Sequence, residues 1–126
     1  MTPVNVRYIV DDVDAAIAFY TERLGFSVEL HPAPGFARLA RGDLRLLLNT
    51  PGGRGGAGQP GIDGRLPEPG NWNRFQLEVD DLAATIAALR DAGVALRMDV
   101  VEGIGGRQAL VEDPAGNCVE LFEPAA

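Results

Sequence analysis

The chain has 126 residues, of which 46% are apolar and 23% are charged, so it is long enough for one globular domain and has the composition of a soluble protein. No apolar run approaches the roughly 18 residues that a membrane-spanning helix needs, and the N-terminal residues lack the pattern of a signal peptide. The single cysteine, Cys118, cannot form an internal disulfide. We therefore expect a cytoplasmic protein with no membrane partner.

The net charge is −7, and all 11 basic side chains are arginines. A negatively charged protein repels a phosphate backbone, and no run of basic residues overrides that repulsion locally, so we expect no nucleic-acid partner. The overall field favours a cationic small molecule, but only weakly, because salt screens distant charges.

One unit is written twice along the chain. The segment 10–17 (VDDVDAAI) reappears 69 residues later as 79–86 (VDDLAATI), and LGF at 24–26 matches AGV at 92–94 at a shift of 68. Such a repeat predicts two copies of one supersecondary unit. We expect a single domain over 1–126, with a first module at about 1–50 and a second at about 72–126.

The first copy begins with a strand, because Val4, Val6, Tyr8 and Val10 alternate with the residues between them. Asp11 or Asp12 can then cap a helix, and Gly25 suits the left-handed residue that ends it. The apolar face of this helix consists of Val13, Ala16, Ile17, Tyr20 and Leu24. Three shorter strands are predicted to follow, at 27–30, 36–40 and 44–49.

Residues 51–71 join the two copies. They are rich in glycine and proline and nearly free of large apolar side chains. A connection this long without secondary structure is uncommon inside a compact domain. Two interpretations remain open, a flexible linker and a lid over a binding site.

The second copy repeats the scheme. Alternation over 74–79 predicts a strand, Asp80 or Asp81 caps a helix with its apolar face at Leu82, Ile86 and Leu89, and Gly93 ends it. Three strands are predicted to follow, at 96–101, 107–112 and 117–123. The segment 113–117 (DPAGN) predicts a tight hairpin turn, since proline fixes φ and glycine tolerates positive φ.

The strand-Asp-Asp-helix-Gly-Phe opening and the closing segment 112–122 (EDPAGNCVELF) resemble the vicinal-oxygen-chelate superfamily. That superfamily contains glyoxalase I, extradiol dioxygenases, fosfomycin-resistance enzymes and bleomycin-binding proteins, and the resemblance covers essentially the whole chain. It implies an α+β fold in which tandem βαβββ modules form a part-open barrel with a concave pocket. It also implies a homodimer, since these folds commonly complete the pocket across two chains.

Enzymes of this superfamily usually bind one divalent metal through His or Glu on the first and last strands of each half. The resemblance places those positions at Asn5, Arg74, Glu120 and one residue within Leu46-Leu47-Leu48. Only Glu120 could ligate a metal, and the guanidinium of Arg74 stays charged and has no lone pair to donate. Neither His31, expected at the surface or in a turn, nor Cys118, expected as a buried packing thiol, has a partner at ligand spacing. We therefore expect no metal and no cofactor.

Strand alternation then indicates which side chains face the concavity. The candidate ligand-binding set is Asn5, Arg7, Leu48, Trp72, Arg74, Gln76, Glu78, Glu120 and Phe122. Aromatic, arginine and carboxylate groups together are typical of a small-molecule site, and Trp72 could stack on a planar ligand. The alternative is structural: Arg74 neutralises Glu120, Arg7 pairs with Glu78, and the aromatic rings plug the barrel mouth or a dimer seam.

These features favour a protein that sequesters an aromatic or antibiotic-like small molecule without metal chemistry, and that is not an enzyme. One alternative is a glyoxalase-like lyase or isomerase, or a dioxygenase, with a rebuilt metal site, or a metal-free enzyme that uses Glu120 as a base. Another is a module that only dimerises or regulates a partner. A Ser-His arrangement is not supported, because Ser27 is the only serine, and the glycine-rich segment 52–56 lacks the Lys-Ser/Thr ending of a phosphate-binding loop.

Overall fold

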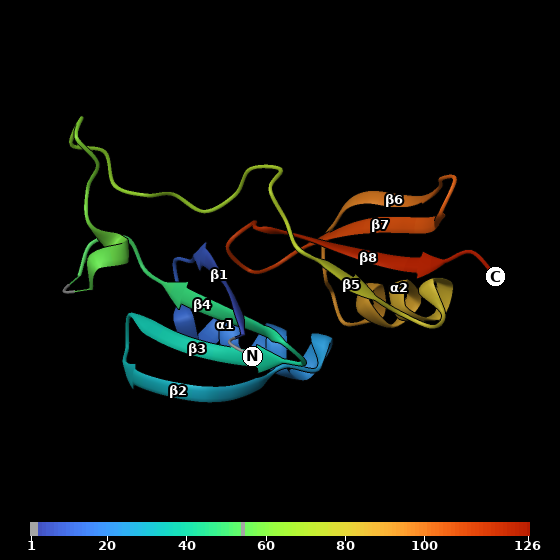
Figure 1. Ribbon diagram of the computed structural model, residues 1–126, viewed down its shortest axis with the longest axis horizontal. Helices are drawn as coiled ribbons and strands as arrows, with labels where there is room; N and C mark the ends of the chain where they lie inside the picture. The colour runs from blue at the N-terminus through green and yellow to red at the C-terminus, as the bar shows by residue number, and fades with distance from the viewer. Residues whose placement is uncertain (1–2, 54) are drawn as a thin grey trace. The chain divides into compact units, whose positions relative to one another are not determined.

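Two four-stranded sheets and two α-helices are found among residues 3–53 and 55–126, the part of the chain that this computed structural model describes. The chain divides into two units, Met1–Gly70 and Asn71–Ala126, so most of the predicted linker belongs with the first module. Figure 1 shows each helix lying along one face of the sheet of its own unit.

The first unit is a βαβββ module with an open sheet. Its elements are β1 (Val4–Ile9), α1 (Val13–Leu24), β2 (Ser27–Ala33), β3 (Phe36–Arg41) and β4 (Leu44–Asn49). The strand order is β1-β4-β3-β2, in which β1 and β4 run parallel and the other neighbours run antiparallel. The side chains of Leu39, Leu46 and Leu48 are fully buried and form the core with the apolar face of α1.

The second unit repeats this topology. Its elements are β5 (Gln76–Glu78), α2 (Leu82–Asp91), β6 (Leu96–Glu102), β7 (Gly106–Glu112) and β8 (Cys118–Pro124). The strand order is β5-β8-β7-β6, with β5 and β8 parallel. The tandem βαβββ arrangement and the α+β class are thus confirmed, and none of the described strands closes either sheet into a barrel.

Both helices begin at the second aspartate of the repeated Asp-Asp pair. The carboxylate of Asp12 accepts a hydrogen bond from the amide of Ala15 (3.1 Å), and that of Asp81 accepts one from the amide of Ala84 (3.0 Å). These bonds satisfy amides that have no partner inside the helix. The first helix ends at Gly25, whose φ of 74° is the left-handed conformation predicted for that position.

The connection over 51–70 contains local structure. A short 3₁₀ helix, Gly56–Gly58, lies in a loop that is closed by a hydrogen bond from the Gly52 amide to the Gly58 carbonyl (2.6 Å). The side-chain amide of Gln59 donates to the carbonyl oxygens of Gly53 (2.7 Å) and Gly55 (3.1 Å). Whether this loop serves as a lid stays a prediction.

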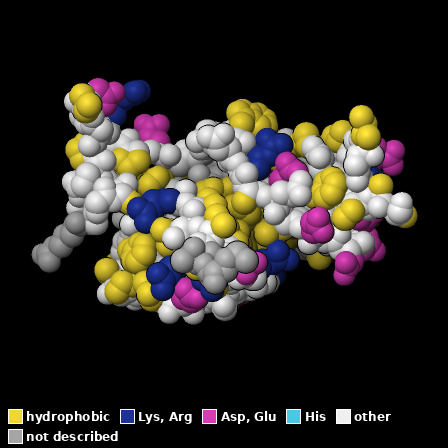
Figure 2. All heavy atoms as spheres, viewed as in Figure 1, with side chains coloured by type: hydrophobic (Ala, Val, Ile, Leu, Met, Phe, Trp, Pro, Cys, Tyr) yellow, Lys and Arg dark blue, Asp and Glu magenta, His cyan; other side chains and the backbone are white. Residues whose placement is uncertain are grey.

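No helix among the described residues is long and apolar enough to cross a membrane. Figure 2 shows acidic and basic side chains interspersed over the face that it presents, and the described residues form no continuous basic patch on that face.

Candidate ligand-binding site

An ion cluster occupies the middle of the second sheet. Glu120 on β8 is only 8% exposed and lies opposite Gln76 of β5. Its Oε1 accepts a hydrogen bond from Nε of Arg74 (3.0 Å) and lies 2.9 Å from Nη2, and its Oε2 accepts one from Nε2 of Gln76 (2.5 Å). Both carboxylate oxygens therefore accept hydrogen bonds. Arg74 forms the ion pair with Glu120 that the structural alternative predicted.

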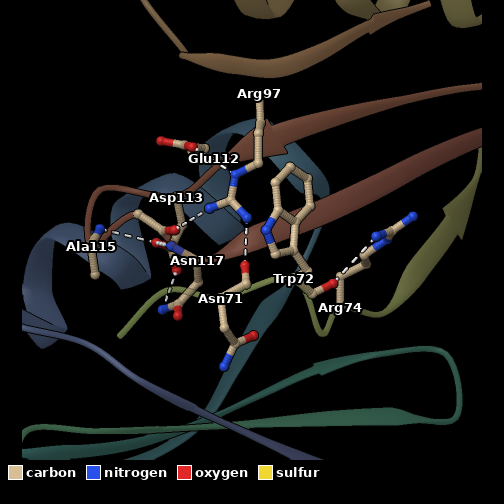
Figure 3. A network of polar contacts seen from close by, with 9 residues as sticks. Asn71, Trp72, Arg74, Arg97, Glu112, Asp113, Ala115 and Asn117 are labelled. Carbon is tan, nitrogen blue, oxygen red and sulfur yellow. Dashed lines mark hydrogen bonds and ion pairs between the residues drawn. The ribbon is translucent and has the colours of Figure 1, made fainter. Parts of the chain in front are cut away.

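Trp72 precedes this cluster and is 63% exposed. The guanidinium carbon of Arg97 lies 4.8 Å from the centroid of its ring, within the range of a cation–π contact. Nη1 of Arg74 donates to the carbonyl oxygen of Trp72 (3.3 Å), so the tryptophan is tied to both arginines. Figure 3 shows the indole with the guanidinium groups of Arg97 and Arg74 on either side of it in that view.

Arg97 is held by hydrogen bonds in addition to this contact. Its Nε donates to the carboxylate of Glu112 (2.8 Å), its Nη2 to the carbonyl of Gly116 (2.7 Å), and its Nη1 to the carbonyl of Asn71. The hydrogen bond to Glu112 is the main reason why the pKa of Arg97 lies above its usual value. The side chain is only 16% exposed, so Arg97 is a fixed, permanently charged group beside Trp72.

The hairpin turn between β7 and β8 positions the carbonyl of Gly116. Oδ1 of Asp113 accepts hydrogen bonds from the amides of Ala115 (2.9 Å) and Asn117 (2.8 Å), and Nδ2 of Asn117 donates to the other carboxylate oxygen (3.1 Å). Asp113 and Asn117 are both buried, and Gly116 takes a φ of 88°. The DPAGN segment thus forms the turn that its sequence predicts, and Figure 3 shows it beside Arg97.

Cys118 begins β8 and is a buried free thiol. It pairs in register with Glu112, and because side chains alternate along a strand it lies on the same face as Glu120. Burial raises the pKa of this thiol above its usual 9.0, with smaller opposing effects of Arg97 and Arg74. A raised thiol pKa leaves little thiolate at neutral pH, which is the property of a packing cysteine.

The remaining predicted residues of the second unit are Glu78 and Phe122, which are register partners on β5 and β8. They share the face of Gln76 and Glu120, two residues further along each strand. Glu78 is exposed and, among the described residues of its own unit, forms no ion pair. Phe122 is half-buried, and its ring edge lies against Gly105 and Gly106.

In the first unit, Asn5 and Arg7 are exposed on β1 and share one face of the sheet. The prediction of Leu48 as a ligand-facing residue is wrong. Leu48 pairs with Tyr8, is 0% exposed, and belongs to the core on the opposite face from Arg7. Leu47 pairs with Arg7 and is the leucine that shares its face, because a shift of one residue moves a side chain to the other side of a strand.

Sequence reasoning missed Arg97 entirely. A register shift between Leu96 and Met98 leaves Arg97 without a directly opposite residue on β7, and such a bulge redirects a side chain. Alternation alone predicts a regular strand over 96–101. The sequence shows only that Arg97 lies between Trp72 and the DPAGN turn in the same module, which does not indicate that its side chain contacts either one.

The residues at the superfamily's metal positions do not fit a divalent ion. The first unit offers the amide of Asn5 and the hydrocarbon of Leu47, and the second offers Arg74 together with a carboxylate that Arg74 and Gln76 already engage. Zinc sites typically use three His, Cys or carboxylate ligands, and the described residues contain no group of three such side chains. His31 lies on β2 at 3.9 Å from Asp14, not in such a group.

Comparisons with known proteins give a consistent assignment. The family model described as Glyoxalase/Bleomycin resistance protein/Dioxygenase superfamily matches residues 3–121. A comparison with curated proteins finds no match.

Solved structures similar to this chain include antibiotic-binding proteins. TnmS3, an antibiotic-binding protein from Streptomyces sp. CB03234, is 26% identical with a TM-score of 0.68, over 99% of this chain and 97% of that one. The bleomycin-binding protein from Streptomyces verticillus, in complex with copper(II)-bleomycin, is 25% identical with a TM-score of 0.63, over 99% and 98%. Lactoylglutathione lyase from Agrobacterium tumefaciens is 24% identical with a TM-score of 0.72, over 95% and 91%, a likeness of fold alone.

Proposed function

Because the chain belongs to the glyoxalase/bleomycin resistance protein/dioxygenase superfamily, we propose that it binds and sequesters a planar aromatic, antibiotic-like small molecule. The observation that carries this proposal is Trp72, a largely exposed indole that Arg97 holds in place from one side. An exposed aromatic ring that is fixed before a ligand arrives loses little conformational freedom on binding. Two similar structures are of antibiotic-binding proteins, which supports the same class of ligand.

The proposed function involves no metal and no catalytic step. Glu120 is the one carboxylate at the superfamily's metal positions, and its oxygens accept hydrogen bonds from Arg74 and Gln76. A metal could bind Glu120 only after displacing these donors, and the guanidinium would then repel it. The lyase-like and dioxygenase-like alternatives require a ligand set built elsewhere.

We also propose that the protein acts in the cytoplasm as a homodimer. The exposed apolar side chains of Val101 and Ile104 at the β6–β7 hairpin are the kind of surface that a second copy could cover. Sedimentation analysis would test this part separately from ligand binding, since a monomer at micromolar concentration would contradict it.

The test of the proposed function uses the only tryptophan as its reporter. Copper(II)-bleomycin and an anthraquinone sulfonate are titrated into the purified protein while Trp72 fluorescence and the Tm are followed. We expect saturable quenching with at least one compound and a Tm that rises with its concentration. Trp72→Leu should retain the wild-type Tm without ligand and lose the ligand-dependent rise.

Two results would overturn the proposal. One is a broad panel of planar antibiotics that produces neither quenching nor a Tm rise. The other is a stoichiometric transition metal in protein purified without chelator, together with lyase, isomerase or dioxygenase turnover that depends on it.

A further inference from the structure

We infer that Arg97 sets the charge preference of the site, so that the open face of Trp72 accepts electron-rich planar rings, neutral or anionic, and disfavours planar cations. This inference rests on the proposed function, because it assumes that the open face of Trp72 meets a ligand. It names a specificity-determining residue and the chemical class of ligand, neither of which follows from the family.

The geometry leaves one face of the indole for a ligand. The guanidinium of Arg97 covers one face at 4.8 Å from the ring centroid, while Trp72 as a residue remains 63% exposed. A planar ligand stacking on Trp72 therefore approaches opposite Arg97. In that arrangement the indole lies between the guanidinium and the ligand.

Arg97 cannot turn away when a ligand arrives. Its donors are used by Glu112, by the carbonyl of Gly116 and by the carbonyl of Asn71, and the bulge of β6 directs the side chain toward these partners. A guanidinium also stays protonated at any physiological pH. The charge beside the ring is therefore a constant property of the site.

A cation on one face of an aromatic ring makes the other face less attractive to a second cation. The π electrons that attract a cation are drawn toward the guanidinium, and the two positive groups repel each other through the ring. The neutralising carboxylate of Glu112 lies on the side of Arg97 away from the indole in Figure 3, so the guanidinium is the charge next to the ring. An electron-rich or anionic ring, in contrast, is attracted to the same arrangement.

The net charge of −7 favours a cationic ligand, whereas the charge of Arg97 beside the ring disfavours one. Most of that charge is distant and screened by salt over about 8–10 Å at physiological ionic strength. Arg97 is in direct contact with the ring, whereas Arg74, which donates to the Trp72 carbonyl, is paired with Glu120. The charge of Arg97 therefore decides the preference.

The experiment compares two planar probes of similar size by isothermal titration calorimetry, the anion anthracene-2-carboxylate and the cation proflavine. We expect the wild-type protein to bind the anion about tenfold more tightly than the cation, the size of effect that one contact with a charge at a partly exposed ring produces. Arg97→Met, which keeps the length of the side chain without its charge, should reduce this ratio at least fivefold, partly by binding proflavine more tightly. Arg97→Lys, which keeps the charge, should retain the preference.

The matched control is Arg90→Met. It removes the same charge from the same unit at an arginine that pairs with Asp99 on the surface, so the ratio of the two affinities should stay at the wild-type value. A general loss of fold in any variant is detected by its Tm, and the wild-type ratio tests the inference without any substitution.

The outcomes separate the two proposals. If the wild-type protein binds neither probe and none of the planar antibiotics, the proposed function fails and this inference fails with it. If the wild-type protein binds planar ligands but prefers proflavine or shows no preference, the inference alone is overturned. The same conclusion holds if Arg97→Met keeps the wild-type ratio, or if Arg97→Lys loses the preference as Arg97→Met does, since the role of Arg97 would then be positional and not electrostatic.

Discussion

Replacing Glu120 by alanine should lower the free energy of unfolding by about 3 kcal/mol, because it leaves Arg74 without the buried carboxylate with which it pairs. The carboxylate is 8% exposed and accepts hydrogen bonds at 3.0 Å from Arg74 and 2.5 Å from Gln76. A hydrogen bond to a charged group contributes about 1.5–3 kcal/mol, and breaking one side of a buried ion pair costs about 3–5 kcal/mol. The side chain of Arg74 is 28% exposed and can recover some water, which places the expectation at the lower end of that range.

Urea unfolding at pH 7 measures this loss. Glu22→Ala removes an exposed carboxylate from α1 and should change the free energy of unfolding by no more than about 0.5 kcal/mol. The double variant Arg74→Leu, Glu120→Leu leaves neither charge unpaired and should recover most of the stability that Glu120→Ala loses. A loss below about 1 kcal/mol for Glu120→Ala would refute the reasoning, because the ion pair and hydrogen bonds of the carboxylate would then contribute little to stability.

Three further substitutions test the local structure. The Arg107 guanidinium and the first amide of α2 hold the pKa of Glu123 below its usual 4.5, so the stability that this carboxylate adds is present above about pH 4.5 and is lost as the pH falls through the lowered pKa. Glu123→Gln should therefore have a lower Tm than the wild-type protein at pH 7 and approach it near pH 3. Asp12→Ala should cost about 1 kcal/mol in urea unfolding through loss of the helix cap, whereas Asp11→Ala should cost much less. At Gly58 an added methyl group would overlap two carbonyl oxygens of its loop, so Gly58→Ala should speed amide hydrogen exchange there and leave the rest of the first unit protected.

Much of the fold could be predicted because its signals are local and occur twice. The Asp-Asp pair, the apolar helix face and the terminal glycine each constrain the backbone within a few residues. Asp12 and Asp81, the second member of each pair, form the caps, a choice that the sequence left open. Within the described residues, each helix connects the two edge strands of its own sheet, β1 to β2 and β5 to β6, so the same topology arises twice.

The site was harder to predict because it depends on register and on an irregular strand. A leucine triplet cannot show which member faces the sheet surface, and the prediction chose Leu48 where the register places Leu47. Arg97 reaches Trp72 and the 112–117 segment through a bulge, which the apolar alternation does not reveal. The Arg74–Glu120 pair could be predicted only because the resemblance to the superfamily places both residues at metal-ligand positions.

The two units use one topology but differ at corresponding positions, and this difference is informative. Leu47 and Glu120 occupy the same place in their sheets, since each lies on the last strand opposite a first-strand residue, Arg7 or Gln76. The first unit thus has the aliphatic side chain of Leu47 at the position where the second unit has the buried carboxylate of Glu120. An ion pair at such a position is seldom more stable than apolar residues of similar size, so stability alone gives no reason to keep it. A role in ligand binding beside Trp72 would explain why the ion pair is kept. The variant Arg74→Leu, Glu120→Leu tests this role: recovered stability with lost ligand binding supports it. Recovered stability with unchanged ligand binding contradicts it.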